Sequence, residues 1–222
     1  MSGTTQSAEG TAPKAPPSSR RGLVISACVA VAVLTAIGLD TTVVPIGSDG
    51  DVRQQAFSPD SWGEAEFPRV QAMVLDKAVD ALVLAPAVLA DKVAAGKQYG
   101  TAASTGSIML VRLTGVVGEA KAGTYVLAVD GMPPEIKVRL QSGPAINGTD
   151  LRDAPGDIAF GAFKNQIEYQ DAGSGLNRAM KKAVLDGIDT ANLTGKTIEV
   201  VGAFRLVNPK NWMITPVQVT VK

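Results

Sequence analysis

The stretch SIMLVRLTGVVGEAKAGTYVLAVDGMPPEIKVRL, residues 107–140, decides the fold. Tight-turn signals at Lys121-Ala122-Gly123 and Asp130-Gly131 divide it. The runs between these turns have the β-branched, alternating composition of strands. They cover residues 107–117, 124–129 and 135–140. The stretch therefore predicts three antiparallel strands joined by short turns.

The sequence after residue 140 adds one helix and two strands. The run LNRAMKKAVL (176–185) has apolar residues spaced by four, as in a helix with one buried face. A helical stretch beginning at Phe160 precedes it, and we expect Gly173-Ser174-Gly175 to interrupt that stretch. Residues 197–201 and 213–221 have the composition of strands.

The order of three strands, a helix and two strands is that of an OB-fold barrel. We expect an α+β domain, mainly β, with an OB-fold-like five-stranded barrel over residues 106–222 and a helix between strands 3 and 4. Gly115 and Gly202 lie inside strand patterns and fit the bends or bulges that close such a barrel. An α+β sandwich of the same elements is the alternative.

A helical segment, residues 59–97, precedes the predicted barrel. Pro68 is expected at the first position of an amphipathic helix that runs to Leu84, since proline suits that position. Pro86 is expected to restart or kink this helix, and Gly96 to end a second helical stretch.

An uncharged apolar run, GLVISACVAVAVLTAIGL, occupies residues 22–39. At about 1.5 Å per residue a helix of this length spans roughly 27 Å, close to the hydrocarbon thickness of a bilayer. Arg20 and Arg21 precede it and Asp40 follows it, so the positive-inside rule places the N-terminus in the cytoplasm. We expect a single-pass protein of the cell membrane. Its predicted parts are a disordered cytoplasmic tail (1–21), a transmembrane signal anchor (22–39), a linker (40–58) and an extracytoplasmic domain (59–222).

Other interpretations of the apolar run remain open. It is also consistent with a cleaved signal peptide, with small residues such as Ala36 near the cut. A lipoprotein signal is a further alternative, because Ile25-Ser26-Ala27-Cys28 fits a lipobox locally. A lipobox cysteine should follow the apolar region, yet most of the run comes after Cys28. We therefore interpret Cys28 as a small lipid-facing residue and do not expect its lipidation.

Composition excludes several classes of function. Histidine is absent and the chain has one cysteine, so neither a Ser-His-Asp or Cys-His apparatus nor a zinc site of His or several Cys ligands can form. The formal net charge is zero, with 21 basic and 21 acidic residues, which argues against nucleic-acid binding. We expect no cofactor and no resident metal.

The candidate binding residues lie in the polar, glycine-rich stretch 143–166. One interpretation is a loop shaped by Asn and Asp turn chemistry, in which Arg152 pairs with a carboxylate. The functional interpretation is a polar pocket at the barrel mouth. In that pocket Arg152 and Asp153 would hold a polar ligand and the amides would recognise its hydroxyl groups. The candidate ligand-binding residues are Asn147, Thr149, Arg152, Asp153, Asn165 and Gln166.

Three carboxylates in the same stretch, Asp150, Asp153 and Asp157, are the remaining candidates for chemistry. A pair of them could in principle act as the acid and base of a hydrolase. Their spacing is not that of a calcium loop. We expect no enzymatic activity and no catalytic residue, and keep a hydrolase using this cluster as a remote alternative.

Several short motifs are spread over the second part of the chain. They are Phe57 to Trp62, Tyr99-Gly100, Gly143-Pro144, Gly148-Thr149, Arg152-Asp153, Phe160 to Tyr169, Gly195-Lys196, Gly202-Ala203-Phe204 and Ile214-Thr215-Pro216. Through these motifs the chain resembles a bacterial family of predicted periplasmic lipoproteins whose function is unknown. The resemblance covers about residues 55–222 and departs at the N-terminus, where a signal-anchor-like helix replaces a proper lipobox. Members often occur beside sugar ABC-transporter components, which implies an accessory role in carbohydrate uptake.

These observations together predict a membrane-anchored extracytoplasmic protein without enzymatic activity. The leading hypothesis is an accessory or ligand-binding module of a sugar ABC-transport system. Its expected partners are the cytoplasmic membrane and either transporter components or a small polar ligand. The alternative is a protein-protein interaction scaffold of the envelope, which an exposed apolar patch on the helix 68–84 would favour.

Overall fold

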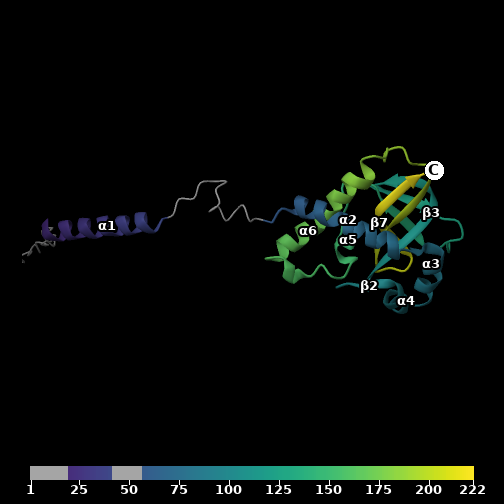
Figure 1. The fold of residues 1–222 in the computed structure, drawn as a ribbon, viewed down its shortest axis with the longest axis horizontal. Coiled ribbons are helices and arrows are strands. Elements are labelled where there is room, and N and C mark those ends of the chain that lie inside the picture. Colours follow the sequence, from purple (N-terminus) through teal and green to yellow (C-terminus); the bar gives the residue numbers. More distant parts are fainter. Residues whose placement is uncertain (1–19, 42–56) are drawn as a thin grey trace, which may run out of the picture. The chain divides into compact units, whose positions relative to one another are not determined.

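The computed structural model describes residues 20–41 and 57–222. The chain divides into two units, of which the first contains helix α1 (Arg20–Asp40) and the second, Phe57–Lys222, is a compact domain (Figure 1). Helix α1 is long and apolar enough to cross a membrane, with a mean hydropathy of 2.5 over Gly22–Asp40. The predicted cytoplasmic tail and most of the predicted linker lie outside the described residues.

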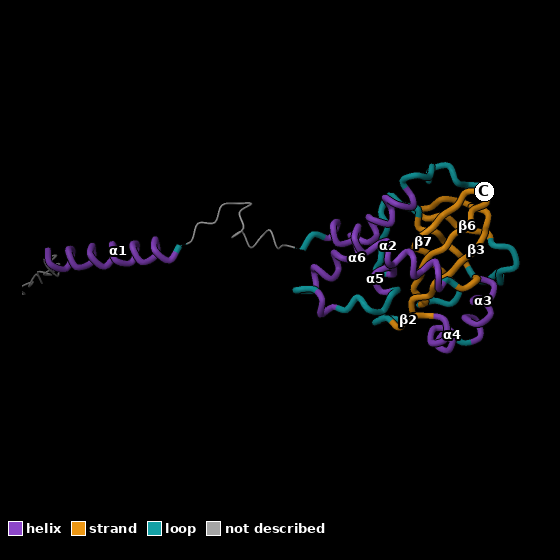
Figure 2. The backbone as a smooth tube through the Cα atoms, in the orientation of Figure 1, coloured by secondary structure: helices purple, strands orange, loops and turns teal. Residues whose placement is uncertain are grey.

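Five strands of the domain form a closed ring (Figure 2). They pair in the order β3-β4-β5-β7-β6, and β6 pairs again with β3. All neighbours are antiparallel except β5 and β7, which are parallel. The strands are β3 (Ser107–Lys121), β4 (Thr124–Ala128), β5 (Lys137–Gln141), β6 (Thr197–Leu206) and β7 (Asn211–Val221). The predicted order of three strands, a helix and two strands is confirmed.

The first part of β3, residues 108–111, is buried on both faces, which explains why it is continuously apolar. Met109 and Val111 belong to a core cluster inside the ring, together with the stacked rings of Phe204 and Trp212. Successive side chains of a strand point to opposite faces. Accordingly, Ile108 and Leu110 belong to a second core cluster, which the helices on the outside of the ring complete.

Two helices cover the outer face of the ring, α2 (Pro59–Lys77) and α6 (Gln166–Met180). A π-helical turn, η3 (Lys181–Leu185), continues α6. A Cβ on Gly175 would lie 2.0 Å from the carbonyl oxygen of Pro59, and one on Gly63 would lie 2.4 Å from the backbone of Gly175. The two helices therefore approach each other through glycine, at a separation that any side chain would prevent.

The remaining short elements connect α2 to the ring. They are β1 (Val79–Asp80), α3 (Ala81–Ala90), α4 (Lys92–Tyr99) and β2 (Gly100–Ala102). Leu84, Ala85 and Val88 of α3 join the core cluster inside the ring. Both helices begin at an aspartate, because Asp80 accepts a hydrogen bond from the backbone N–H of Leu82 and Asp91 accepts one from that of Val93.

The predicted helical segment 59–97 agrees with the start of α2 and nearly with the end of α4, but the predicted helix boundaries inside it are wrong. Helix α2 begins at Pro59, capped by Ser58, so Pro68 lies inside a helix instead of at its start. The helix ends at Lys77 and does not reach Leu84, since Asp80 caps a new helix. Pro86 and Gly96 lie inside α3 and α4 and neither starts nor ends a helix.

Two further expectations are corrected in the second half of the chain. Helix α6 runs through Gly173-Ser174-Gly175 without interruption, because glycine at this point admits α2. The irregularity in β3 lies between Val117 and Ala120, not at Gly115, which pairs regularly with Ile198. Gly202, in contrast, does lie at a register shift between β6 and β7, as predicted.

Candidate functional site

The stretch 143–166 is anchored to the ring by Arg205 at the end of β6. Its guanidinium donates to Asp153 Oδ2 at 2.6 Å, to Asp150 Oδ1 at 3.2 Å and to Thr149 Oγ1 at 3.1 Å. Asp150 and Asp153 are the first and last residues of the short helix α5 (Asp150–Asp153), and Thr149 directly precedes it. Two of the predicted binding residues, Thr149 and Asp153, are therefore brought together, and an arginine that the sequence interpretation missed joins them.

Arg152 is buried, with 7% of its surface exposed. Its Nε and Nη2 atoms lie 2.8 and 2.7 Å from Asp153 Oδ1, and Nη1 donates to the Tyr169 carbonyl at 2.8 Å. The guanidinium carbon lies 3.6 Å from the centre of the Tyr169 ring, in cation–π contact. Arg152 thus joins α5 to α6, and most of its donors are already used.

The two partly buried carboxylates of this network have opposite pKa shifts. Burial alone would raise the pKa of Asp153, but hydrogen bonds from Arg205, Arg152 and Thr149 outweigh it and the pKa falls below its usual value. Burial dominates at Asp150 and raises the pKa of that carboxyl, although Arg205 opposes the shift. Asp153 is therefore the carboxylate that the network holds in its charged form.

The other predicted residues have separate roles. The backbone of Asn147 exchanges two hydrogen bonds with the buried side chain of Gln141. The side chain of Asn165 caps α6 by accepting from the backbone N–H of Glu168. Asp157 is bound by Arg69 of α2 through two hydrogen bonds of 2.9 and 3.0 Å. The supposed cluster of three aspartates is thus divided, because Arg205 and Arg152 bind Asp150 and Asp153 whereas Arg69 binds Asp157.

A cavity of about 450 Å³ lies beside the Arg152 network. Three of the six predicted binding residues line it, namely Arg152, Asp153 and Gln166. The side chain of Gln166 is exposed at the start of α6. The other lining residues, which the sequence interpretation did not include, are Ala102, Ala103, Ser104, Gly156, Ile158 and Tyr169. Among the described residues, no group of three His, Cys, Asp or Glu side chains could hold a metal ion.

Aromatic side chains gather next to this cavity and form what we call the aromatic cluster: Phe57, Trp62, Phe160, Phe163 and Tyr169. Phe163 contacts the rings of Phe57, Trp62 and Tyr169 at centroid distances of 5.5, 5.6 and 5.4 Å. Phe160 packs edge-on against Tyr169 at 5.6 Å. Tyr169 therefore belongs to both the aromatic cluster and the cavity, and connects the two.

Comparison with known proteins identifies the family. The family model of the predicted periplasmic lipoproteins called DUF2291 matches residues 27–220. The chain belongs to this family. No curated protein matches the DUF2291 chain.

The domain of this DUF2291 protein is similar to a solved OB-fold protein from Thermotoga maritima. The similarity has a TM-score of 0.60 and covers 75% of the present chain and 99% of the other chain, at 15% sequence identity. At this identity the similarity concerns the fold alone, and it agrees with the ring of five strands and the helix α6 between the third and fourth of them.

Two of the stretches through which the chain resembles DUF2291 proteins meet in the aromatic cluster. Phe57 directly precedes the cap of α2 and Trp62 lies in its first turn, whereas Phe160, Phe163 and Tyr169 come from a part of the sequence some hundred residues later. Their spatial convergence was not visible in the sequence. The only available signal was the presence of all five residues in the motifs of the resemblance.

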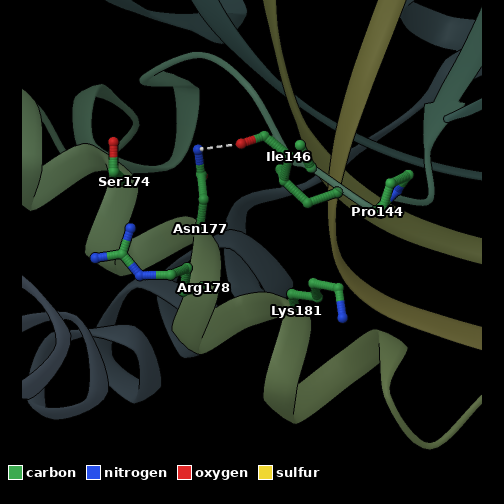
Figure 3. A pocket seen from close by; sticks show the side chains of 7 residues that line it. Pro144, Ile146, Ser174, Asn177, Arg178 and Lys181 are labelled. Atoms are coloured by element: carbon green, nitrogen blue, oxygen red, sulfur yellow. Dashed lines mark hydrogen bonds between the residues drawn. The ribbon is translucent and has the colours of Figure 1, made fainter. Parts of the chain in front are cut away.

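A second cavity, of about 320 Å³, lies between residues 144–146 and α6 (Figure 3). Asn177 donates to the carbonyl of Gly148 at 2.9 Å and holds the loop against the helix. The two cations of this cavity are already paired, Arg178 with Asp60 and Lys181 with Asp186. They extend to opposite sides in Figure 3, so they do not converge on a common ligand.

Proposed function

We propose that this DUF2291 protein is a membrane-anchored extracytoplasmic module that binds a small polar ligand of the carbohydrate class for a sugar ABC-transport system. Helix α1 would anchor it as a single span, with Arg20 on the cytoplasmic side. The cavity beside Arg152 would be the binding site. The link to sugar transport rests on the genomic association that the family resemblance implies.

One observation carries the ligand-binding part of the proposal, which is the combination of polar and aromatic groups around a single cavity. Gln166 and Ser104 offer hydrogen-bonding groups and Asp153 adds a negative charge, while the Tyr169 ring, on which Arg152 stacks, forms part of the wall. Sugars present hydroxyl groups at their edges and apolar C–H groups on their faces. A few placed polar groups with an aromatic wall are what a site for such a ligand requires.

The carboxylates support a role without catalysis. A hydrolase needs one acid and one base facing the same bond at a set separation. Here Asp153 is held by two arginines, and Asp157 pairs with Arg69 on another helix. A permanent arginine partner favours the ionised form and occupies the oxygens that would transfer a proton. We therefore assign these aspartates to binding and structure.

The test is a thermal-shift screen of the full chain in detergent against monosaccharides, sugar acids and divalent metals. A ligand at a hundred times its Kd should stabilise the domain by about 2.7 kcal/mol. Gln166→Ala should abolish the shift without unfolding the domain, because this side chain is exposed. Gln170→Ala is the matched control, on the same helix but outside the cavity.

A screen without a hit from the folded protein would contradict ligand binding and favour the scaffold. The structure does not place the apolar patch of such a scaffold on α2, where Phe67, Val70 and Val74 are all buried. The exposed apolar residues of the segment 68–84 are Leu82 and Val83 of α3. A cross-linking experiment in membranes would then identify the partner.

A further inference from the structure

The aromatic cluster is concentrated and partly exposed. It contains five of the aromatic residues of a chain that has only two Trp, three Tyr and five Phe. Phe160 is 50% exposed, and Ile167, two residues before Tyr169 in the sequence, is 71% exposed. The cores need neither of these two side chains, since neither belongs to a core cluster. An exposed apolar patch of this kind marks an interaction surface.

The path of the chain indicates which surface the cluster meets. Phe57 belongs to the cluster and is also the first described residue after the segment 42–56 that follows α1. A segment of that length spans at most roughly 50 Å, at about 3.3 Å per residue. If α1 is a membrane anchor, as the proposed function has it, the chain enters the domain at the aromatic cluster, within that distance of the end of the anchor.

The charges near the aromatic cluster favour a membrane contact made by apolar side chains. Asp60, close to Trp62 in the sequence, pairs with Arg178 at 2.6 Å. Asp157, close to Phe160, pairs with Arg69 at 2.9 Å. Lys164, Glu168 and Asp171 of the same stretch add one positive and two negative charges, so the cluster has no basic excess that would attract acidic headgroups. Aromatic rings, and tryptophan above all, are instead favoured at the boundary between headgroups and acyl chains.

We propose that the aromatic cluster docks the domain onto the outer leaflet of the membrane that carries its own anchor. Phe160 and Ile167 enter the interfacial region, and Trp62 lies at headgroup level behind them. The occupant of this surface is lipid, and the contact depends little on ionic strength. The proposal rests on α1 being an anchor.

The chain contains its own fluorescent probes for a test, because it has two tryptophans. Trp62 lies in the aromatic cluster, whereas Trp212 is fully buried inside the ring. The full chain is reconstituted into phosphatidylcholine vesicles with and without lipid brominated near the headgroup end of the acyl chains. Docking predicts that the brominated lipid quenches the tryptophan emission, and that the quenching is lost in Trp62→Phe. Quenching that persists in Trp62→Phe, or is absent from the wild type, would overturn the proposal.

Variants separate docking from anchoring. Phe160→Ser and Ile167→Ser should reduce the quenching of Trp62 while the protein still floats with the vesicles. Val83→Ser is the control, since Val83 is also 50% exposed but lies on α3, across the domain from the start of α6 (Figure 1). Protein that does not float would contradict the anchor itself. Protein that floats with unquenched Trp62 would contradict docking alone.

Discussion

At the scale of single residues, Arg152 has more structural than ligand-binding character. Its planar guanidinium binds Asp153 and the Tyr169 carbonyl and also stacks on the Tyr169 ring. A lysine cannot reproduce this combination. We predict that Arg152→Lys lowers the free energy of unfolding by about 3 kcal/mol, as for a broken buried ion pair. Urea denaturation measures this, with Arg178→Lys as the control.

Arg178 is a suitable control because its pair with Asp60 is exposed at 54% and 69%. A pair of this kind contributes roughly 0–1 kcal/mol, so Arg178→Lys should leave the unfolding midpoint almost unchanged. Equal losses of unfolding free energy in the two variants would show that the interactions of Arg152 contribute no more than an exposed ion pair.

Asp153 makes the stability of the domain depend on pH. Its pKa is lower in the folded protein than its ordinary value of 3.8. The unfolded chain therefore binds the proton more readily, and acid favours unfolding. The stabilisation is complete above pH 3.8 and is lost as the pH falls through the lower folded pKa. We predict that Asp153→Asn removes this part of the acid sensitivity, measured as unfolding free energy between pH 6 and 3.

The comparison with wild type shows whether acid reduces or increases the contribution of Asp153 to stability. The stability difference between wild type and Asp153→Asn should be largest near neutral pH and shrink below pH 3.8. Asp150, whose pKa is raised, has the opposite linkage: its ionised form costs stability, and acid relieves that cost. A stability difference between wild type and Asp153→Asn that grows on acidification would contradict the conclusion that Asp153 is the carboxylate held in its charged form.

At the scale of elements, the crossing of α2 and α6 depends on glycine. Alanine normally stabilises a helix by about 1 kcal/mol relative to glycine. At Gly175, however, the added methyl group would lie 2.0 Å from the Pro59 carbonyl oxygen. We predict that Gly175→Ala destabilises the domain by about 2 kcal/mol, in the range of overpacked cores. Thermal unfolding checks this, with Gly187→Ala as control because no atom lies within 4 Å of its added Cβ.

This crossing also shows why the sequence predicted the strands better than the helices. Each strand carries its own alternation, so residues 107–140 were enough to place β3, β4 and β5 nearly correctly. The glycines in α6 are compatible both with the end of a helix and with the close packing of another helix, and the local sequence does not distinguish the two. Only the position of Pro59, more than a hundred residues earlier, decides between the two.

The candidate site was predictable to a similar extent. Of the six residues predicted from the turn-rich stretch 143–166, Arg152, Asp153 and Gln166 line one cavity. Arg205 was missed because the pattern of a strand does not indicate which loop the residues at the end of that strand will contact. The aromatic cluster was missed for the same reason, since its rings come from two distant stretches.

At the scale of the whole molecule, Tyr169 links the two proposals. It lines the cavity and contacts both Phe160 and Phe163 of the aromatic cluster. Docking of the cluster onto a bilayer would therefore hold the cavity close to the membrane surface. A binding module of a transport system acts where the transporter opens, so this location is consistent with the proposed function.

The N-terminus provides the last prediction. The family match begins at residue 27, directly before Cys28, and lipoprotein processing cuts a chain immediately before the cysteine that is acylated. Most of the apolar residues of α1 follow Cys28, however. The uncleaved helix is therefore long enough to span a bilayer. We predict that the protein isolated from membranes has the mass of the complete chain, and that Cys28→Ala changes neither this mass nor the membrane fraction. A mature protein that starts at Cys28 and carries a lipid, with processing blocked in Cys28→Ala, would instead show that acyl chains hold the domain at the membrane.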